Sequence, residues 1–574
     1  MTPILARRGR LLVLVGALFV SVGAMRAAWP LVALGTVVLC AVATAYLLFF
    51  PVAILLRRRK VEMAWWVPPG EQPGGSLTVD HAFSLHVAFR NYGMRRLRIL
   101  NVRLFASSAL ELPDAAIPAD VPRGHEVELV VPLHARAAGY WAFHGAVVTL
   151  GDFLGLFELR AYFPNPVGVK VFPKLSSPRA GRLEARPSAG ALHERVGVHP
   201  IRRRGVVGEL REIREHAHGD PFKFIAWKAT ARRRQLMVRD LENEIVVTYQ
   251  LLVDISGSMR GGSHGRTKLD YAVETASGIA RASLEGGDRV GLVTFDTRVY
   301  SHLKPDEGRP HHLKVIDRLL ETRNVVDEDL TDITDGELVA AVARYLAHQE
   351  AIDVRLRSAP PVGDPAWSRI ATGPKGELYD LAALARVVGT LLKADSAAAE
   401  ARRAKAPAWW WQRVHIGEGT DPEMARLRLF CRLRGIELPY RQSAAHGQRA
   451  TGLADAIGLA SAADRAQVML LVSDLGGVID EPQAAVRAIA LARRRHHQVI
   501  AVSPFGPSFA PRPTSDQALR VADILSLDER RRLEQARKEL VRLGVPVVIA
   551  GPEDSVAAIA RKVQKTRARL RGHG

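Results

Sequence analysis

The stretch Ile245-Val-Val-Thr-Tyr-Gln-Leu-Leu-Val-Asp-Ile-Ser-Gly-Ser258 decides the fold of the second half of this chain. Its first nine residues, Ile245–Val253, form an apolar run that is typical of a strand covered on both faces. A carboxylate and two hydroxyls follow at Asp254, Ser256 and Ser258. Oxygen ligands with few carboxylates suit Mg²⁺, which prefers octahedral geometry and retains bound waters. The stretch therefore predicts a buried strand that ends in a candidate metal site.

Strand and helix patterns alternate along the rest of the C-terminal half. Apolar runs predict strands at 245–253, 289–295, 468–473, 499–502 and 545–550, and helical patterns lie at 268–284, 311–320, 453–463, 482–495, 528–543 and 554–570. This alternation predicts an α/β fold with a doubly wound sheet. Ligands of such sheets bind beyond the carboxyl ends of the strands. Asp254 and Asp474 both follow strand ends, so we expect the two carboxylates to converge on one edge.

The motif Asp254-x-Ser256-x-Ser258, together with the strand end Val472-Ser473-Asp474, resembles the metal-ion-dependent adhesion site of von Willebrand factor A domains. The resemblance covers about residues 244–570 and implies a von Willebrand A-like domain over 244–574. It also implies that two Ser, one Thr and two Asp surround a divalent ion, Mg²⁺ or Mn²⁺. A partner protein's carboxylate then completes the coordination shell.

The threonine of that site has two candidates. Thr451 precedes the predicted helix that leads into the Asp474 strand, whereas Thr331 lies much earlier in the chain. We prefer Thr451, because a residue at a loop-to-helix junction can direct its hydroxyl toward the strand ends. The predicted metal ligands are then Asp254, Ser256, Ser258, Thr451 and Asp474.

Choosing Thr451 implies a long insertion into the domain, at about residues 321–449. We expect it to contain an Ala/Leu-rich helix around Leu378–Lys405 and a second helix at Pro422–Arg434. It also contains three adjacent tryptophans, Trp409–Trp411. They are either a packed junction or a partner contact, since exposed aromatic residues favour interfaces.

The first 60 residues are typical of a membrane anchor. Leu11–Met25 and Ala27–Leu56 are apolar runs, and the second exceeds the roughly 20 residues needed to cross a bilayer. Arginines precede the first run, and the basic segment Arg57–Lys60 follows the second. The positive-inside rule then predicts a two-helix, multi-pass membrane anchor with both of its ends, and the main body of the chain, in the cytoplasm. A cleaved signal peptide is disfavoured, because no Ala-x-Ala closely follows Met25.

Residues 61–173 alternate apolar and polar side chains and contain regular turn signals, so they predict a β-rich, sandwich-like domain. Residues 174–243 predict a basic linker followed by a short signature segment. That segment is Arg214-Glu-His-Ala-His-Gly-Asp-Pro-Phe-Lys-Phe-Ile-Ala-Trp-Lys-Ala-Thr-Ala-Arg232. Its Lys223 and Lys228, with Arg232, are suited either to an acidic partner or to pairing with local carboxylates.

The signature segment, the stretch Asp152-Phe-Leu-Gly-Leu-Phe157 and the two apolar helices resemble the bacterial domain-of-unknown-function-58 proteins. One departure is His216, where those proteins usually have Tyr. The resemblance implies a partner or adaptor of a MoxR-type AAA+ ATPase in a chaperone-like assembly.

Composition excludes several other classes of protein. The net charge is +21, yet the sequence has no nucleic-acid-binding motif. Its two cysteines cannot form a disulfide framework, and it has neither H-E-x-x-H nor a P-loop motif. Gly261–Gly265 matches the G-x-S-x-G pattern of hydrolases, but the metal-type loop separates it from the preceding strand. We therefore expect a metal-dependent protein-binding module and no enzyme; the alternatives are a membrane scaffold with a vestigial metal site and, less favoured, a serine hydrolase.

Overall fold

The computed structural model describes residues 3–57, 60–68, 77–93, 95–113, 118–174, 199–218, 220–262, 265–323, 325, 330–350, 352–356, 370–402, 422–441, 448–463, 466–510, 513–554, 558–559 and 562. Three features singled out from the sequence lie outside these residues: Trp409–Trp411, Ser263 with His264 in the G-x-S-x-G match, and most of the predicted helix 554–570.

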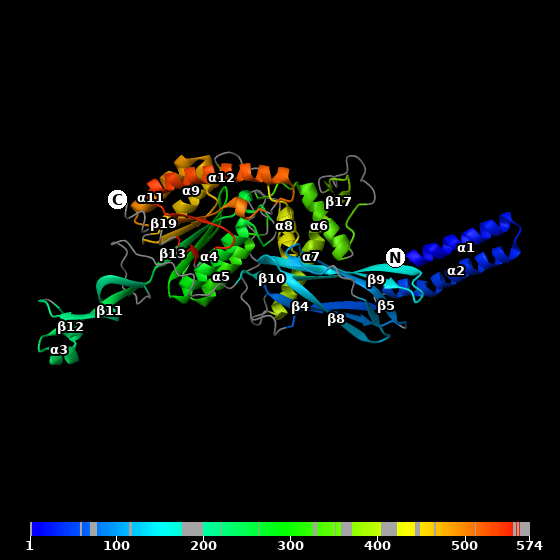
Figure 1. Cartoon of the computed structure of the whole chain (residues 1–574), viewed down its shortest axis with the longest axis horizontal. Coiled ribbons are helices and arrows are strands. Elements are labelled where there is room, and N and C mark those ends of the chain that lie inside the picture. Colours follow the sequence, from blue (N-terminus) through cyan, green and yellow to red (C-terminus); the bar gives the residue numbers. More distant parts are fainter. Residues whose placement is uncertain are drawn as a thin grey trace. The chain divides into compact units, whose positions relative to one another are not determined.

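The chain begins with two antiparallel helices, α1 (Arg7–Met25) and α2 (Trp29–Arg57), drawn in blue in Figure 1. Their backbones approach closely at glycines: a Cβ on Gly35 would lie 2.6 Å from the Gly16 carbonyl oxygen. Small residues permit such close packing of apolar helices. Both helices are long and apolar enough to cross a membrane, over Arg7–Met25 and Trp29–Ile54. This agrees with the predicted helical hairpin and indicates association with a membrane.

The chain divides into two compact units, and the first comprises residues 1–136, 140–171 and 324–439. Its strands are β1 (Ile4–Leu5), β2 (Val61–Trp66), β3 (Leu77–Thr78), β4 (Ala82–Asn91), β5 (Leu97–Ala106), β6 (Leu110–Glu111), β7 (Ala119–Val121), β8 (Glu126–Ala135), β9 (Gly139–Gly151) and β10 (Phe157–Phe172). They form one sheet of order β1-β10-β9-β5-β7, with β3 beside β10, and another of order β2-β4-β8-β6. The apolar residues at every second position of β4, Phe83, Leu85, Val87 and Phe89, are buried, as the alternating pattern predicts.

Unit 1 also contains three helices from the predicted insertion, α6 (Asp335–Gln349), α7 (Leu381–Arg402) and α8 (Pro422–Leu433), with a small ribbon of β16 (Ile370–Thr372) and β17 (Leu378–Asp380). They share an apolar core that includes Leu338, Leu384 and Phe430. The segment after α8 contacts the β-rich part, because the Ser108 hydroxyl donates to Glu437 at 2.6 Å. From the sequence, we assigned the whole insertion, at about residues 321–449, to the α/β domain. We did not predict the helix α6.

Unit 2 comprises residues 137–139, 172–323 and 440–574 and is built on a six-stranded sheet of order β15-β14-β13-β18-β19-β20. The strands are β13 (Thr248–Asp254), β14 (Arg289–Phe295), β15 (Val299–Asp306), β18 (Val468–Val472), β19 (Gln498–Pro504) and β20 (Val547–Ala550). All neighbours are parallel except β14 and β15. The five predicted strands are confirmed, whereas β15 was missed.

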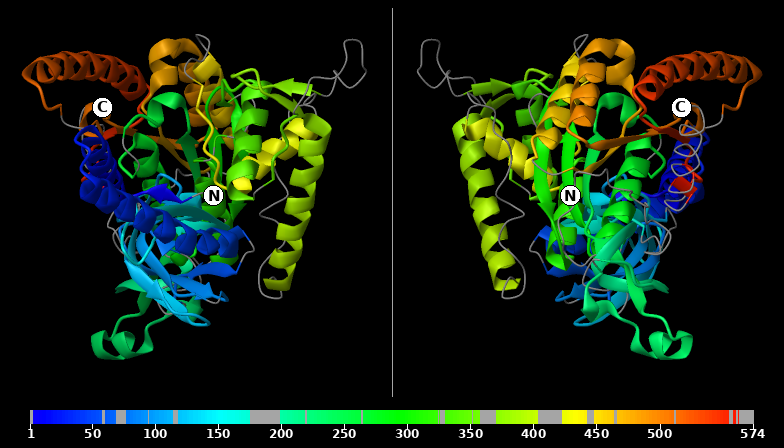
Figure 2. Two further views of the ribbon diagram at one scale, coloured as in Figure 1. Left: turned by 90° about the vertical axis from the view of Figure 1, so that its right-hand side faces the viewer. Right: turned by 90° about the vertical axis from the view of Figure 1, so that its left-hand side faces the viewer.

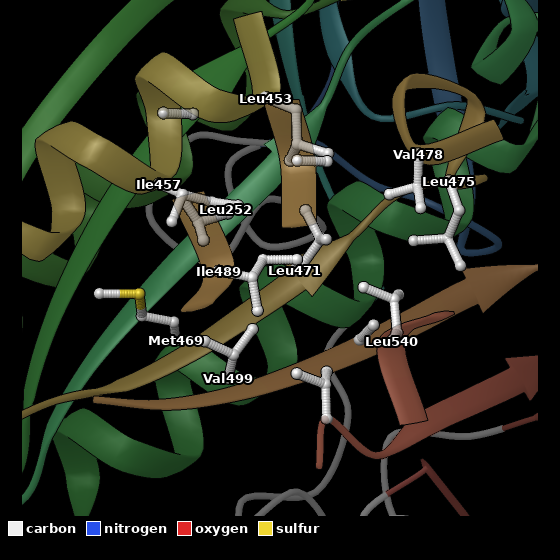
Figure 3. Close-up of a cluster of buried hydrophobic side chains, with 14 of the residues drawn as sticks. Leu252, Leu453, Ile457, Met469, Leu471, Leu475, Val478, Ile489, Val499 and Leu540 are labelled. Carbon is white, nitrogen blue, oxygen red and sulfur yellow. The ribbon is translucent and has the colours of Figure 1, made fainter. Parts of the chain in front are cut away.

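Helices cover both faces of this sheet (Figures 1 and 2). On one face lie α4 (Lys268–Glu285) and α5 (Arg309–Glu321), and on the other α9 (Gln448–Ser461), α10 (Gly476–Asp480), α11 (Pro482–Arg494) and α12 (Asp516–Arg542). The second group packs on the strands through fully buried residues such as Leu252, Leu471, Ile457 and Ile489 (Figure 3). This explains why the strands are apolar on both faces.

A two-stranded antiparallel hairpin of β11 (His199–Glu215) and β12 (Met237–Ile245) precedes the sheet. Its tip contains the short helices η3 (Phe222–Phe224) and α3 (Trp227–Arg233), of which α3 is labelled in Figure 1. From His199 onward, the basic linker expected before the signature segment is instead part of the paired strand β11. The signature segment occupies the end of this hairpin.

Candidate functional site at the carboxyl edge of the sheet

The order of the strands reverses between β13 and β18, because the chain builds outward from β13 in one direction and from β18 in the other. Such a reversal leaves a crevice at the carboxyl ends of the two strands, where α/β sheets bind ligands. Asp254 is the last residue of β13, and Asp474 lies two residues beyond β18. The predicted convergence of the two carboxylates therefore takes place at this crevice.

Asp254 is held rigidly by its neighbours. One carboxylate oxygen accepts the Ser256 N–H at 2.9 Å, and the other accepts the Ser473 hydroxyl at 2.6 Å. Its side chain is almost fully buried, as is that of Ser256, which precedes the short helix η4 (Gly257–Met259). The Ser256 and Ser258 hydroxyls lie 3.2 Å apart. Four of the five predicted ligands, Asp254, Ser256, Ser258 and Asp474, are thus brought together.

A residue that the sequence did not single out, Arg449 in the first turn of α9, connects these groups. Its Nη2 donates to the Ser256 hydroxyl at 3.0 Å, to the Ser258 hydroxyl at 2.9 Å and to Asp474 Oδ1 at 2.9 Å. The same nitrogen lies 3.7 Å from Asp254 Oδ2. One guanidinium nitrogen therefore contacts all four oxygen-bearing side chains.

A second cation completes the cluster. Lys268 Nζ lies 3.2 Å from Asp474 Oδ2, and the Lys268 side chain is only 11% exposed. Two carboxylates, Asp254 and Asp474, are then balanced by two cations, Arg449 and Lys268. Buried charges persist when they are paired in this way. We call these four residues, with Ser256 and Ser258, the edge cluster.

The two carboxylates of the edge cluster experience opposite electrostatic effects. Burial raises the pKa of Asp254 above its ordinary value, more than the Arg449 guanidinium lowers it. Burial also acts to raise the pKa of Asp474, but Lys268 and Arg449 outweigh it and hold that pKa well below its ordinary value. Burial lowers the pKa of Arg449, and the two carboxylates more than reverse that effect. Asp474 and Arg449 therefore form a firmly ionised pair.

Glycines make room for the groups that cover this edge. A Cβ on Gly476 would lie 2.1 Å from Arg449 Nη1, so a larger residue there would displace the guanidinium. A Cβ on Gly257, inside the Asp-x-Ser-x-Ser motif, would lie 2.8 Å from the ring of Tyr440. The residues around the two aspartates are thus shaped to accommodate Arg449 and Tyr440.

A third aspartate occupies the same edge. Asp296 directly follows β14, is 2% exposed, and accepts hydrogen bonds from the Tyr440 hydroxyl and from Arg441. The Arg260 guanidinium lies over the Tyr440 ring, 4.6 Å from its centroid, and burial lowers the pKa of Arg260 to about 10. The sequence carried a signal for Asp296, since it follows a predicted strand just as Asp254 does. We did not use it.

The two candidate threonines lie elsewhere. Thr451 is exposed and lies two residues after Arg449 in the first turns of α9. Residues two apart on a helix do not face the same side, so Arg449, rather than Thr451, takes the place at the cluster. Thr331 belongs to unit 1, where its hydroxyl accepts the Ile333 N–H at 3.2 Å. The sequence argument identified the helix that approaches the cluster, and the residue of that helix that contacts the cluster is Arg449, two positions before the predicted Thr451.

The edge cluster does not fit a bound divalent ion as it stands. Mg²⁺ requires oxygen ligands at about 2.0–2.1 Å, and Arg449 Nη2 already lies within hydrogen-bonding distance of three of the oxygens that would bind it. An added ion would also give the buried cluster two surplus positive charges, which is unfavourable. Among the described residues, no group of three or more His, Cys, Asp or Glu side chains gathers elsewhere either.

The signature segment at the hairpin tip has a structural anchor and an exposed face. Arg214 donates to both carboxylate oxygens of Asp220 at 2.7 Å, and Asp220 also accepts the Ala217 N–H at 2.8 Å. Around this anchor, Phe222 is 74% and Trp227 is 66% exposed. The predicted basic residues of this segment also lie on the exposed surface: Lys223, Lys228 and Arg232, with Arg233 and Arg234.

Comparisons with known proteins cover parts of the chain. Uncharacterized protein Rv1480 of Mycobacterium tuberculosis (strain ATCC 25618 / H37Rv) is 29% identical over 123 residues, which is 21% of this chain and 38% of the relative. Uncharacterized protein YeaD of Bacillus subtilis (strain 168) is 25% identical over 174 residues, or 30% of this chain and 40% of the relative. The chain therefore matches well under half the length of these relatives.

Two solved structures align with this chain at low scores. A FixG-related protein from Vibrio parahaemolyticus aligns with a TM-score of 0.14 and 10% identity, over 20% of this chain and 96% of that one. Alpha-2-macroglobulin from Escherichia coli aligns with a TM-score of 0.17 and 12% identity, over 89% of this chain and 62% of that one. Scores this low carry no argument about fold. Residues 212–348, which include the hairpin tip and Asp254, Ser256 and Ser258, match the family described as "Protein of unknown function DUF58".

Proposed function

We propose that this chain is a membrane-anchored protein-binding module without a catalytic role. The observation that carries the proposal is the tip of the β11–β12 hairpin, which exposes Phe222 and Trp227 among basic side chains. Exposed aromatic residues and arginines are enriched where proteins bind one another. The ion pair between Arg214 and Asp220 stabilises the conformation of the tip that exposes these side chains.

The partner is a protein with an acidic surface. The tip presents five exposed cations, Lys223, Lys228, Arg232, Arg233 and Arg234, whereas its one acidic side chain between residues 216 and 236, Asp220, already binds Arg214. Charge complementarity favours an acidic counterpart and accelerates its association. The resemblance to DUF58 proteins points to a MoxR-type AAA+ ATPase as that partner, in a chaperone-like assembly.

The edge cluster supports a binding role over a catalytic one. A nucleophile needs an adjacent base that is able to accept a proton. Here the carboxylates nearest to Ser256 and Ser258 are paired with Arg449 and Lys268. The alternative nucleophile, Ser263, lies outside the described residues. A von Willebrand A-like origin of unit 2 is part of the proposal, and it rests on the motif and on the parallel sheet.

In this proposal the module lies at the cytoplasmic face of a bacterial inner membrane. The basic residues of the anchor, at Arg7, Arg8 and Arg10 and again from Arg57 to Lys60, flank its two open ends. The positive-inside rule assigns both ends to the cytoplasm. A phosphatase reporter fused after Lys60 should be inactive in cells, and a cytoplasmic fluorescent reporter at the same point should fluoresce. The opposite pattern contradicts this orientation.

Binding is tested with the full chain in lipid nanodiscs and a purified MoxR-type AAA+ ATPase from the same organism, in the absence of nucleotide. The double variant Phe222→Ser/Trp227→Ser should weaken binding at least tenfold, and raised salt should weaken it further. Phe153→Ser is the matched control, since Phe153 is 91% exposed but belongs to unit 1. If the double variant and the wild type bind alike, the tip is not the contact; if neither binds, the membrane-scaffold alternative is favoured.

A further inference from the structure

We propose that Arg449 is a built-in cation that takes the position of a divalent ion in the edge cluster. The native cluster then binds neither Mg²⁺ nor Mn²⁺, and removal of the Arg449 side chain creates a divalent-metal site. The inference concerns the cation of the cluster only and is independent of whether the hairpin tip binds a protein.

The geometry is the first argument. Arg449 Nη2 contacts the Ser256 and Ser258 hydroxyls and Asp474 Oδ1 at 2.9–3.0 Å, and it approaches Asp254 Oδ2 at 3.7 Å. These are four of the five side chains that the resemblance assigns to a divalent ion. Arg449 Nη2 lies at the centre of the oxygens of these side chains, where a metal ion would lie. It donates hydrogen bonds to three of them, and its positive charge offsets the charge of the carboxylates.

The second argument is that glycines in the surrounding backbone leave the space that Arg449 and the start of α9 occupy. A Cβ on Gly476 would lie 2.1–2.4 Å from three atoms of the Arg449 guanidinium. A Cβ on Gly477 would lie 2.9 Å from the Arg449 carbonyl oxygen, and one on Gly452 would lie 2.1 Å from the Asp296 carbonyl oxygen. The start of α9 therefore packs closely against the loops that follow β14 and β18. This close packing restricts the position of the Arg449 guanidinium.

The third argument is charge. Arg449 and Lys268 balance Asp254 and Asp474, and the Asp254, Asp474 and Lys268 side chains are at most 11% exposed. With Arg449 removed, the cluster retains one net negative charge, two hydroxyls and the space left by the guanidinium. Oxygen-rich sites of that charge suit Mg²⁺ and Mn²⁺. The same residues therefore exclude a metal with Arg449 present and accept one without it.

The test is a Mn²⁺ titration of the full chain in detergent, with free Mn²⁺ measured by electron paramagnetic resonance. The wild type should bind no Mn²⁺ at the cluster, whereas Arg449→Ala should gain one site per chain, with a dissociation constant at least tenfold below that of any residual Mn²⁺ binding by the wild type. Arg449→Lys, which retains a cation, and Arg487→Ala, which removes an exposed arginine on α11, should resemble the wild type. Adding Asp474→Asn to Arg449→Ala should abolish the new site.

Two results would overturn the inference. The first is tight Mn²⁺ binding by the wild type that Asp474→Asn removes, because the native cluster would then be a metal site. The second is a folded Arg449→Ala chain that binds Mn²⁺ no better than the wild type. If Arg449→Ala does not fold, Arg449→Gln provides the same comparison, since it removes the charge while retaining most of the side-chain volume.

Discussion

The interior of the unit 2 sheet and its carboxyl edge are built from the same strands. In the interior, Leu252 and Leu471 are fully buried among apolar neighbours from α9 and α11 (Figure 3). Two or three residues further along, Asp254 and Asp474 are nearly as well buried but contact charges and hydroxyls. Burial in the interior is stabilising by itself, whereas burial at the edge is tolerated only because each charge has a partner. The two regions should therefore respond differently to mutation, to metal and to pH.

The largest effect is expected at the edge. Arg449→Ala leaves Asp254 and Asp474 with one cation between them, and removal of one partner of a buried pair costs about 3–5 kcal/mol. Hydrogen exchange of the β13 and β18 amides reports the opening free energy of this part of unit 2. Added Mn²⁺ should restore part of the loss by occupying the vacated space. An Arg449→Ala chain as stable as the wild type would show that the pairing contributes little.

Leu471→Ala should destabilise the interior by about 2–5 kcal/mol, through lost apolar burial and the cavity left behind. The same exchange measurement on β13, β18 and β19 checks the loss. Mn²⁺ should restore none of it, because no charge is left unpaired. Recovery of Leu471→Ala by Mn²⁺ would mean that the metal acts outside the edge cluster.

The strands and the interior were predictable, and so were the two aspartates. Val, Ile and Leu runs mark β13, β14, β18, β19 and β20, and parallel strands necessarily bring residues such as Asp254 and Asp474 to one edge. The partners of the aspartates were not predictable from spacing. Arg449 reaches the cluster because of the position and rotation of α9 relative to the strands, which spacing does not encode. The resemblance to a metal site favoured Thr451, two residues later.

The helices of unit 1 also show that sequence patterns predict local structure better than tertiary contacts. Two of its helices, α7 and α8, follow from their apolar patterns, close to the predicted bounds. Their place in unit 1 depends on tertiary contacts such as that of Ser108 with Glu437, which no local pattern encodes. Likewise, the long pairing of β11 with β12 joins residues on either side of the signature segment.

Acid should reduce the contribution of the edge and spare that of the interior. The folded pKa of Asp474 is depressed, so its ionised form stabilises the fold at every pH above the unfolded value of about 3.9 and the contribution is lost as the pH falls below it. The opening free energies of wild type and Asp474→Asn should differ more at neutral pH than in acid. The difference should shrink by about 1 kcal/mol or more toward pH 3. A difference that is unchanged across this range contradicts the ionised pair.

The smallest effect is expected at Thr451, although the sequence singled it out. Its side chain is exposed on α9, and substitutions at such positions usually change stability by less than about 0.5 kcal/mol. Thr451→Ala should also leave the Mn²⁺ affinity of the Arg449→Ala background unchanged. If Thr451→Ala lowers the Mn²⁺ affinity of that background, Thr451 is a metal ligand after all.

The central claim is that an arginine, and no metal ion, occupies the edge cluster of the native chain. The most direct measurement is diffraction from crystals of the full chain grown with Mn²⁺, with data collected at the manganese absorption edge. We predict density for the Arg449 guanidinium between Ser256, Ser258 and Asp474, with no anomalous peak among them. An anomalous peak at that position, with Arg449 turned away, would contradict the account.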